Sequence, residues 1–197
     1  WHMLVGRAKI KPGQIVLVMG GSSGVGIFGI QIAKLYGCTV IATASPEKLE
    51  QLKELGADYA VDHRKEDWHK EVFKISKELA KKKNEAPGID VIFEHIGGSH
   101  FNKELTLLKY GATMVTTGAT TGYNVPADLR HIFFKGINIL GSTQGTRAEL
   151  EEGFYWMGQG KIKVIIDSIF TFENAVEAHN KMLNGKGLVG KIILKPE

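Results

Sequence analysis

A glycine-rich run from Gly20 to Gly29 contains the residues whose types and spacing suit chemistry. It holds five glycines and two serines. The run follows the apolar segment Ile15–Met19 and precedes apolar residues at helical spacing, so it joins a buried strand to a helix. At such a junction the first helical N–H groups have no partner, and the helix dipole favours an anion. Glycines let the backbone turn tightly and approach a phosphate closely. The run therefore predicts a binding site for the pyrophosphate of a dinucleotide.

The spacing of these glycines fits three registers. Gly24-x-Gly26-x-x-Gly29 matches the dinucleotide fingerprint literally but begins several residues after the strand. Gly21-x-Ser23-x-x-Gly26 begins in the right place with a serine at the middle position, and we prefer it. Gly20-x-x-x-Gly24-x-Gly26 is a third spacing, used by another class of dehydrogenase. All three bring the N–H groups of Ser23, Gly24 and Val25 to the mouth of the helix. The predicted phosphate-binding residues are Gly21, Ser22, Ser23, Gly24, Val25 and Gly26. A Walker loop is excluded, because no Gly-Lys followed by Ser or Thr comes after the strand.

The second predicted strand, Thr39–Thr43, ends without an acidic residue. An NAD-binding unit places Asp or Glu there to bind the ribose hydroxyls, and that carboxylate would repel the 2′-phosphate of NADP. Its absence, with Lys48 one turn into the next helix and His63 and Arg64 after the third strand, favours NADP(H). A plain helix cap is the alternative role for Ser45, and a solvated lysine is the alternative for Lys48. The missing acid also argues against a methyltransferase, which uses a similar glycine loop.

Strands and helices alternate along the rest of the chain. Short apolar or β-branched runs predict strands, and segments of helical spacing between them predict helices. The predicted strands are 15–19, 39–43, 59–61, 89–93, 112–117, 137–140, 164–170 and 191–194. The predicted helices are 25–36, 45–55, 68–82, 101–108, 128–134, 148–157 and 173–183. This order predicts an α/β fold with a doubly wound parallel sheet, the Rossmann fold.

Composition excludes several classes of protein. The chain has 197 residues, 43% of them hydrophobic and 23% charged, which rules out a disordered or collagen-like chain. Its single cysteine, Cys38, can form no internal disulfide and no cysteine-based zinc site, and it fits a reducing compartment, the cytoplasm. No apolar run is long enough to span a membrane. The basic run Lys81–Lys83 lacks interleaved aromatic residues and arginines, so we expect no nucleic-acid partner and no membrane partner.

Several stretches resemble the medium-chain dehydrogenase/reductase superfamily, and the resemblance spans nearly the whole chain. The superfamily holds zinc alcohol dehydrogenases and zinc-free quinone and enoyl-thioester reductases. One set of matching stretches consists of Lys11–Val18, the glycine run, Ala33–Ala44 and Glu54–Ala57. A second set, Ile89–His95, Thr117–Gly122, Asp128–Arg130 and Ile139–Ser142, is similar to zinc-type alcohol dehydrogenases and to crotonyl-CoA reductases.

The resemblance implies where the cofactor and the missing parts would lie. The nicotinamide end would bind at the tips of the later strands, with candidates His95, Gly97, Gly118, Ala119, Thr120 and Thr143. The 2′-phosphate pocket maps to Thr43, Ser45, Lys48 and His63. Family members carry an N-terminal catalytic domain that holds any zinc and most of the substrate pocket. Residues 1–14 are then the end of a helix and linker from that domain. Residues 15–197 are the dinucleotide-binding domain with a C-terminal return segment.

Together these inferences predict the NADP(H)-binding domain of a medium-chain oxidoreductase. The full enzyme would move a hydride between the nicotinamide and a small-molecule alcohol or carbonyl, a quinone or an enoyl substrate. We identify no catalytic residue and no metal ligand in this chain, and we expect it to be inactive alone. The superfamily commonly pairs edge strands, so we expect a homodimer through Ile137–Leu140. The alternatives are a nucleotide-sensing or structural binding module without chemistry and, with less support, a methyltransferase.

Overall fold

The main sheet has six parallel strands. In a computed structural model that describes residues 1–196, they are β1 Ile15–Val18, β2 Thr39–Ala44, β3 Tyr59–Asp62, β4 Ile89–Glu94, β5 Leu108–Thr116 and β6 Asn138–Gly141. Their order in the sheet is β3-β2-β1-β4-β5-β6, and each pair is parallel. The chain therefore winds outward from β1 in one direction and from β4 in the other, which confirms the doubly wound fold.

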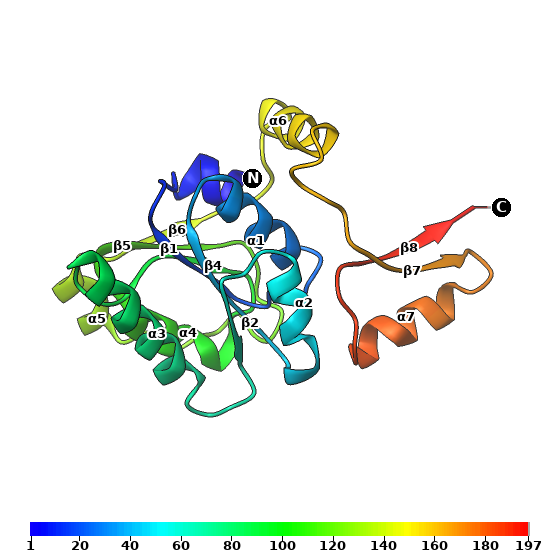
Figure 1. The fold of residues 1–197 in the computed structure, drawn as a ribbon. Coiled ribbons are helices and arrows are strands. Elements are labelled where there is room, and N and C mark those ends of the chain that lie inside the picture. The colour runs from blue at the N-terminus through cyan, green and yellow to red at the C-terminus, as the bar shows by residue number, and fades with distance from the viewer. Residues whose placement is uncertain (197) are drawn as a thin grey trace.

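Helices cover both faces of this sheet (Figure 1). On one face lie α1 Gly26–Leu35 and α2 Leu49–Glu54, which follows a short 3-10 turn over Pro46–Lys48. On the other face lie α3 Trp68–Lys83, α4 Phe101–Leu107, which follows a turn over Gly98–His100, and α5 Leu129–Lys135. Each face has its own apolar core, and the strand side chains alternate between the two. Because both faces are covered, the strands read as continuous apolar runs.

The C-terminal part departs from this alternation. After α6 Arg147–Gly158, the strands β7 Ile166–Thr171 and β8 Lys191–Lys195 pair only with each other, in parallel, with α7 Ala175–Asn184 between them. Figure 1 shows this unit beside the main sheet rather than in it. Parallel sheets are normally covered on both faces, yet Ile169 is 59% exposed and Leu183 is 79% exposed. The unit therefore presents an apolar surface that the described residues leave uncovered.

The N-terminal segment folds against the α1 face of the sheet. His2–Arg7 forms a π-helical turn whose Met3 and Leu4 are buried in the same core as α1. His2 Nδ1 lies 2.9 Å from Glu149 Oε1, and Trp1 Nε1 donates to Glu152 Oε2, so this segment is tied to α6. Within residues 1–196, no helix combines the length and the apolar character needed to cross a bilayer.

Candidate functional site

The glycine run forms a tight turn at the carboxyl end of β1, and Thr43 at the end of β2 holds it in place. The Gly20 amide donates to Thr43 Oγ1 at 3.1 Å, and the Gly21 amide donates to the Thr43 carbonyl at 2.7 Å. Thr43 is fully buried, and its hydroxyl faces Met19 Sδ at 3.8 Å. The sequence places Thr43 in the 2′-phosphate pocket, whereas its contacts here position the loop.

Two positions in the loop require glycine for steric reasons. Gly20 has a φ of +57°, which a residue with a side chain rarely adopts. At Gly26 an added Cβ would run into the Gly20 carbonyl oxygen and lie 2.7 Å from Gly21 Cα. The helix can therefore approach the loop only with glycine at this position, the role of the last glycine in a dinucleotide fingerprint. Gly24 is different, because a Cβ there would meet only the flexible side chain of Lys191.

The mouth of α1 carries unpaired backbone donors. Ser23 Oγ accepts from the Gly26 amide at 2.9 Å and so caps the helix. The Ser23 amide, which the sequence assigns to phosphate, instead donates to the Gly20 carbonyl at 3.0 Å and closes the turn. Among the described residues, the amides of Gly24 and Val25 donate to no backbone or side-chain acceptor. These two N–H groups lie at the positive end of the helix dipole, where an anion is stabilised.

Lys191 brings a cation to this loop from the far end of the chain. Its Nζ lies 2.6 Å from the position that a Cβ of Gly24 would occupy. The Gly190 amide donates to the Ser22 carbonyl at 2.9 Å, which anchors β8 beside the loop. No local pattern in the sequence singles out this lysine, because the contact joins residues more than 160 positions apart. The structure therefore adds Lys191 and Gly190 to the candidate phosphate site.

The ends of β4, β5 and β6 form the next part of the site. Buried Glu94 ends β4 and accepts from the Gly97 amide and from Thr116 Oγ1, both at 2.5 Å. This carboxylate fixes the turn at Gly97, whose φ is +69°. Sequence reasoning missed Glu94, although an acid at the end of an apolar strand was visible there. Its contacts give it a structural role in holding the strand tips together.

The predicted nicotinamide-side residues meet around these tips. Thr120 Oγ1 donates to the His95 carbonyl at 3.2 Å, and a Cβ at Gly118 would lie 2.8 Å from the same carbonyl oxygen. The Ala119 carbonyl accepts from the Gly122 amide, which closes the loop after β5. Thr143 follows β6 and lines a neighbouring cavity. The structure thus brings all of these candidates to one edge of the sheet.

The remaining 2′-phosphate candidates lie at the ends of β2 and β3. Ser45 is 5% exposed and begins the 3-10 turn, while Glu47 two residues later pairs with Arg64 at 3.1 Å. Lys48 Nζ donates to the Gly185 carbonyl at 2.8 Å, and partial burial lowers the pKa of this lysine. His63 Nδ1 is buried and has no hydrogen-bond partner among residues 1–196, and burial lowers the pKa of its ring. Lys48 is therefore held by the C-terminal segment when no ligand competes for it.

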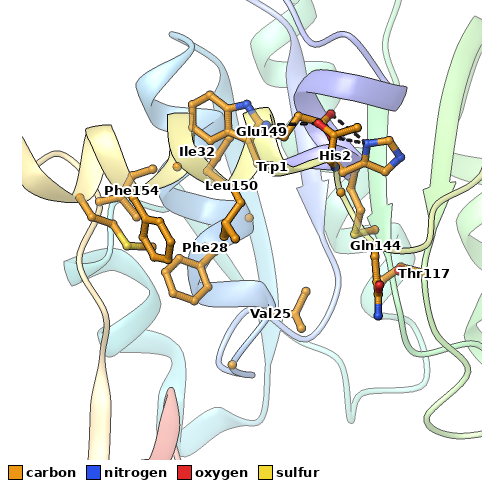
Figure 2. Close-up of a pocket in the computed structure, with 18 of the residues that line it drawn as sticks. Trp1, His2, Val25, Phe28, Ile32, Thr117, Gln144, Glu149, Leu150 and Phe154 are labelled. Atoms are coloured by element: carbon orange, nitrogen blue, oxygen red, sulfur yellow. Dashed lines mark hydrogen bonds and ion pairs between the residues drawn. The ribbon is translucent and has the colours of Figure 1, made fainter.

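An apolar cavity of about 700 Å³ adjoins the mouth of α1. Figure 2 shows Val25 and Phe28 on one side, Leu150 and Phe154 of α6 opposite them, and Thr117 and Gln144 at the strand tips. Lys191 and Gly24 also line it, so the cavity is continuous with the Gly20–Gly26 loop. Within the described residues there is no cluster of three His, Cys, Asp or Glu side chains able to hold a metal ion.

Comparison with known proteins decides the family. The family model for "Zinc-binding dehydrogenase" matches residues 24–159. This chain belongs to that family, in the medium-chain dehydrogenase/reductase superfamily. Among its curated relatives are the quinone oxidoreductase of Pongo abelii, 33% identical over 98% of this chain and 58% of the relative, and the crotonyl-CoA reductase of Streptomyces collinus, 30% identical over the whole chain and 47% of the relative. The chain thus spans about half the length of the curated relatives it matches.

Solved structures of related enzymes superimpose on nearly the whole chain. A crystal structure of an NAD-dependent alcohol dehydrogenase matches with a TM-score of 0.89 and 34% identity, over 99% of this chain and 55% of that one. A crotonyl-CoA carboxylase/reductase matches with a TM-score of 0.86 and 26% identity, over 98% of this chain and 49% of that one. The dehydrogenase thus shares the C-terminal β7–α7–β8 unit as well as the main sheet, because its match covers nearly every residue. This chain corresponds to the C-terminal cofactor-binding domain of the superfamily.

Proposed function

We propose that this chain binds NADP(H) and serves as the cofactor domain of an oxidoreductase. The loop at Gly20–Gly26 carries the proposal, because it sits where the strand order reverses. β1 pairs with β2 on one side and with β4 on the other, and ligands of open α/β sheets bind at the carboxyl ends of strands at such a point. The unpaired amides of Gly24 and Val25 and the ammonium of Lys191 all meet there and suit a pyrophosphate.

The preference for NADP over NAD rests on the end of β2. This strand ends at Ala44 without an acid, and Lys48 lies close by on the following turn. The 2′-phosphate would replace the Gly185 carbonyl as the partner of Lys48, exchanging a neutral acceptor for a charged one. Glu47 is exposed but already paired with Arg64, which reduces its repulsion of a phosphate. Solved relatives of both kinds exist: one is described as an NAD-dependent alcohol dehydrogenase, and a 2-octenoyl-CoA carboxylase reductase is in complex with NADP.

In the full protein we propose hydride transfer to or from an alcohol or carbonyl, a quinone or an enoyl substrate. The nicotinamide supplies the hydride chemistry. The residues of this chain bind and orient the cofactor: the loop holds the pyrophosphate, and the tips of β4, β5 and β6 receive the nicotinamide end. No acid–base group is assigned here, so we expect the chain alone to bind NADPH without turning over a quinone or an alcohol.

Isothermal titration calorimetry with three ligands tests this proposal. NADPH is expected to bind most tightly, NADH more weakly, and S-adenosylmethionine not at all. Tighter binding of NADH would refute the NADP preference, and binding of S-adenosylmethionine alone would favour the methyltransferase. Robust turnover by the chain alone would contradict the assignment of catalysis to another domain. A nucleotide sensor would bind NADPH equally well, and oxidoreductase assays on the full-length protein separate that alternative.

We also propose a homodimer through the β6 edge of the main sheet. In the part of the chain that the structure describes, β6 pairs with β5 alone, so its other edge offers unpaired backbone groups. Exposed apolar side chains on β6 and on α5 just before it define the proposed contact surface: Phe133 is 63% exposed, Phe134 69% and Ile139 38%. Light scattering is expected to report a dimer, and a monomer at high concentration would contradict the proposal. A charge at the centre of this surface, Phe134→Glu, should dissociate the dimer, whereas Tyr123→Glu, on the exposed loop after β5, should leave it intact.

A further inference from the structure

His95 lies beneath the phosphate loop rather than beside it. It follows β4 directly and is 9% exposed, with its ring edge-on to Phe93 at 5.9 Å between centroids. A Cβ added at Gly20 would lie 3.1 Å from His95 Cε1, so the ring packs directly against the first residue of the turn. Its Nε2 lies 3.5 Å from Ser23 Oγ, the atom that caps α1. The imidazole therefore connects β4 to the residues that would surround a pyrophosphate.

The loop has fewer full positive charges beside it than its proposed ligand has negative charges. A dinucleotide pyrophosphate carries two negative charges, and the amides of Gly24 and Val25 supply only partial positive charge. Lys191 is the one full cation that the described residues bring against the loop at Gly24. The charged side chain whose field reaches His95 is Glu94, and its negative charge favours a protonated ring. The other neighbours of the ring are the Met19 backbone, the Phe93 ring and the Ser23 hydroxyl, none of which titrates near neutral pH.

Burial opposes protonation of His95 as long as the loop holds no anion. Loss of hydration lowers the pKa of the ring, although contacts with the Met19 backbone and the charge of Glu94 act in the opposite direction. An anion in the loop would add a strong favourable field at short range. The protonated ring would then provide, beside Lys191, a second full positive charge to balance the two negative charges of the pyrophosphate.

We propose that His95 takes up a proton from solvent when the pyrophosphate of a nicotinamide dinucleotide occupies the Gly20–Gly26 loop. This inference rests on the proposed function and adds to it a proton coupling at a named side chain. The coupling makes cofactor binding pH-dependent. Between the pKa of His95 in the free protein and its pKa in the complex, affinity falls as pH rises, by up to about tenfold per pH unit.

Calorimetry of NADH binding in buffers of different ionisation enthalpy measures the proton uptake directly. NADH is the better probe here, because it lacks the 2′-phosphate of NADPH. Phosphate monoesters titrate at about pH 6, so that group would add its own proton exchange. At pH 6.5 in PIPES, ACES and imidazole, the wild-type chain is expected to take up a substantial fraction of a proton on binding. His95→Gln should bind NADH more weakly with uptake close to zero and a flat pH profile. His179→Gln, at an exposed position on α7, should behave as the wild type.

The outcomes separate this inference from the proposed function. Binding of NADH by the wild type without proton uptake overturns the inference and leaves the proposed function intact. Uptake that persists in a folded His95→Gln variant also overturns it, because another group then carries the proton. Circular dichroism checks that the variant is folded, and His95→Asn provides a second substitution if glutamine does not fit. Failure of both NADH and NADPH to bind the wild type overturns the proposed function and the inference together.

Discussion

The buried carboxyl group of Glu104 allows a sharp test of how burial shifts a pKa in this fold. Glu104 lies on α4 with none of its surface exposed, and among the described residues neither of its oxygens has a hydrogen-bond partner. On the same helix, Phe101 and Leu105 belong to the apolar core beneath α3, α4 and α5. Burial first, and then the negative charge of Glu94, raise the pKa of this carboxyl well above its usual value. Burial therefore favours the protonated form of Glu104, and keeping this polar group out of water costs stability.

The free-energy cost of burying the Glu104 carboxyl sets the expected effect of replacing Glu104. A buried polar group without a partner destabilises a protein by roughly 1–3 kcal/mol. Glu104→Met keeps a similar length and fills the same space with an apolar side chain. We expect it to stabilise the chain by about 1–3 kcal/mol, which corresponds to a rise in Tm of ~2–4 °C per kcal/mol for a protein of this size. Glu104→Gln keeps the shape and the polarity but removes the titration.

The pH dependence follows from the direction of the shift. The folded state binds the proton of Glu104 more tightly than the unfolded chain, whose glutamates titrate near 4.5. The stability associated with protonated Glu104 is thus fully present below pH 4.5. It is lost as pH rises toward the raised pKa of the folded state, by at most about 1.4 kcal/mol per pH unit. Relative to Glu104→Gln, the wild type should therefore become progressively less stable as pH increases.

Urea unfolding at several pH values between 4.5 and 8, followed by circular dichroism, measures these differences. The matched control is Glu177→Gln, an exposed glutamate on α7, whose effect should be small at every pH. If the difference between Glu104→Gln and the wild type does not change with pH, the carboxyl is not held protonated by burial. Destabilisation of Glu104→Met by more than about 1 kcal/mol would show that the carboxyl has a favourable partner.

Three further predictions concern the loop and the α6 contacts. Gly26→Ala should destabilise the chain by about 1–3 kcal/mol and abolish NADPH binding, because the added Cβ has no space. Thermal melting should show that the control Gly24→Ala remains folded. In calorimetry, Lys191→Gln should weaken the binding of both NADH and NADPH by about tenfold, a loss of roughly 1.4 kcal/mol of binding free energy. Lys48→Gln should weaken the binding of NADPH only. Contacts with Thr146 and His2 lower the pKa of Glu149 to about 2, so the stability it provides is present above pH 4.5 and lost as pH falls. Acid unfolding should therefore show the gap between wild type and Glu149→Gln closing between pH 4.5 and 2, and a constant gap would refute the assignment.

The sequence predicts the elements of the main sheet well because their signals are local. Each strand is a short apolar run between a helix end and a turn, and Gly37, with a φ of +72°, marks the end of α1 as expected. The boundaries differ by a few residues, most at the start of β5, which begins at Leu108 rather than at Ala112. Where the end of a helix is expected, His2–Arg7 forms a π-helical turn. Nothing in so short a stretch distinguishes it from the end of an α-helix.

Contacts between distant segments limit what the sequence predicts about the site. The sequence locates the glycines of the Gly20–Gly26 loop because a tight turn and a close helix approach are local demands, while their phosphate binding stays a prediction. Thr43 is different: its residue type suits a phosphate ligand, but its hydroxyl is committed to the Gly20 amide. Lys48 likewise faces the Gly185 carbonyl, a partner more than 130 residues away. Residue type and position in an element do not reveal that a side chain already has a hydrogen-bond partner elsewhere in the fold.

The C-terminal unit shows the same limit at the level of the fold. β7 and β8 have the apolar content of sheet strands, and α7 lies between them as in a βαβ unit, so local pattern assigns them to the main sheet equally well. They instead form a parallel pair, and two strands alone bury too little apolar surface to be stable without further packing. Here the pair is joined to the domain through Gly190 at Ser22, through Gly185 at Lys48 and through Lys191 at Gly24. Each of these contacts falls on the phosphate loop or on the 2′-phosphate candidates. A ligand bound in the loop would therefore lie against the C-terminal unit.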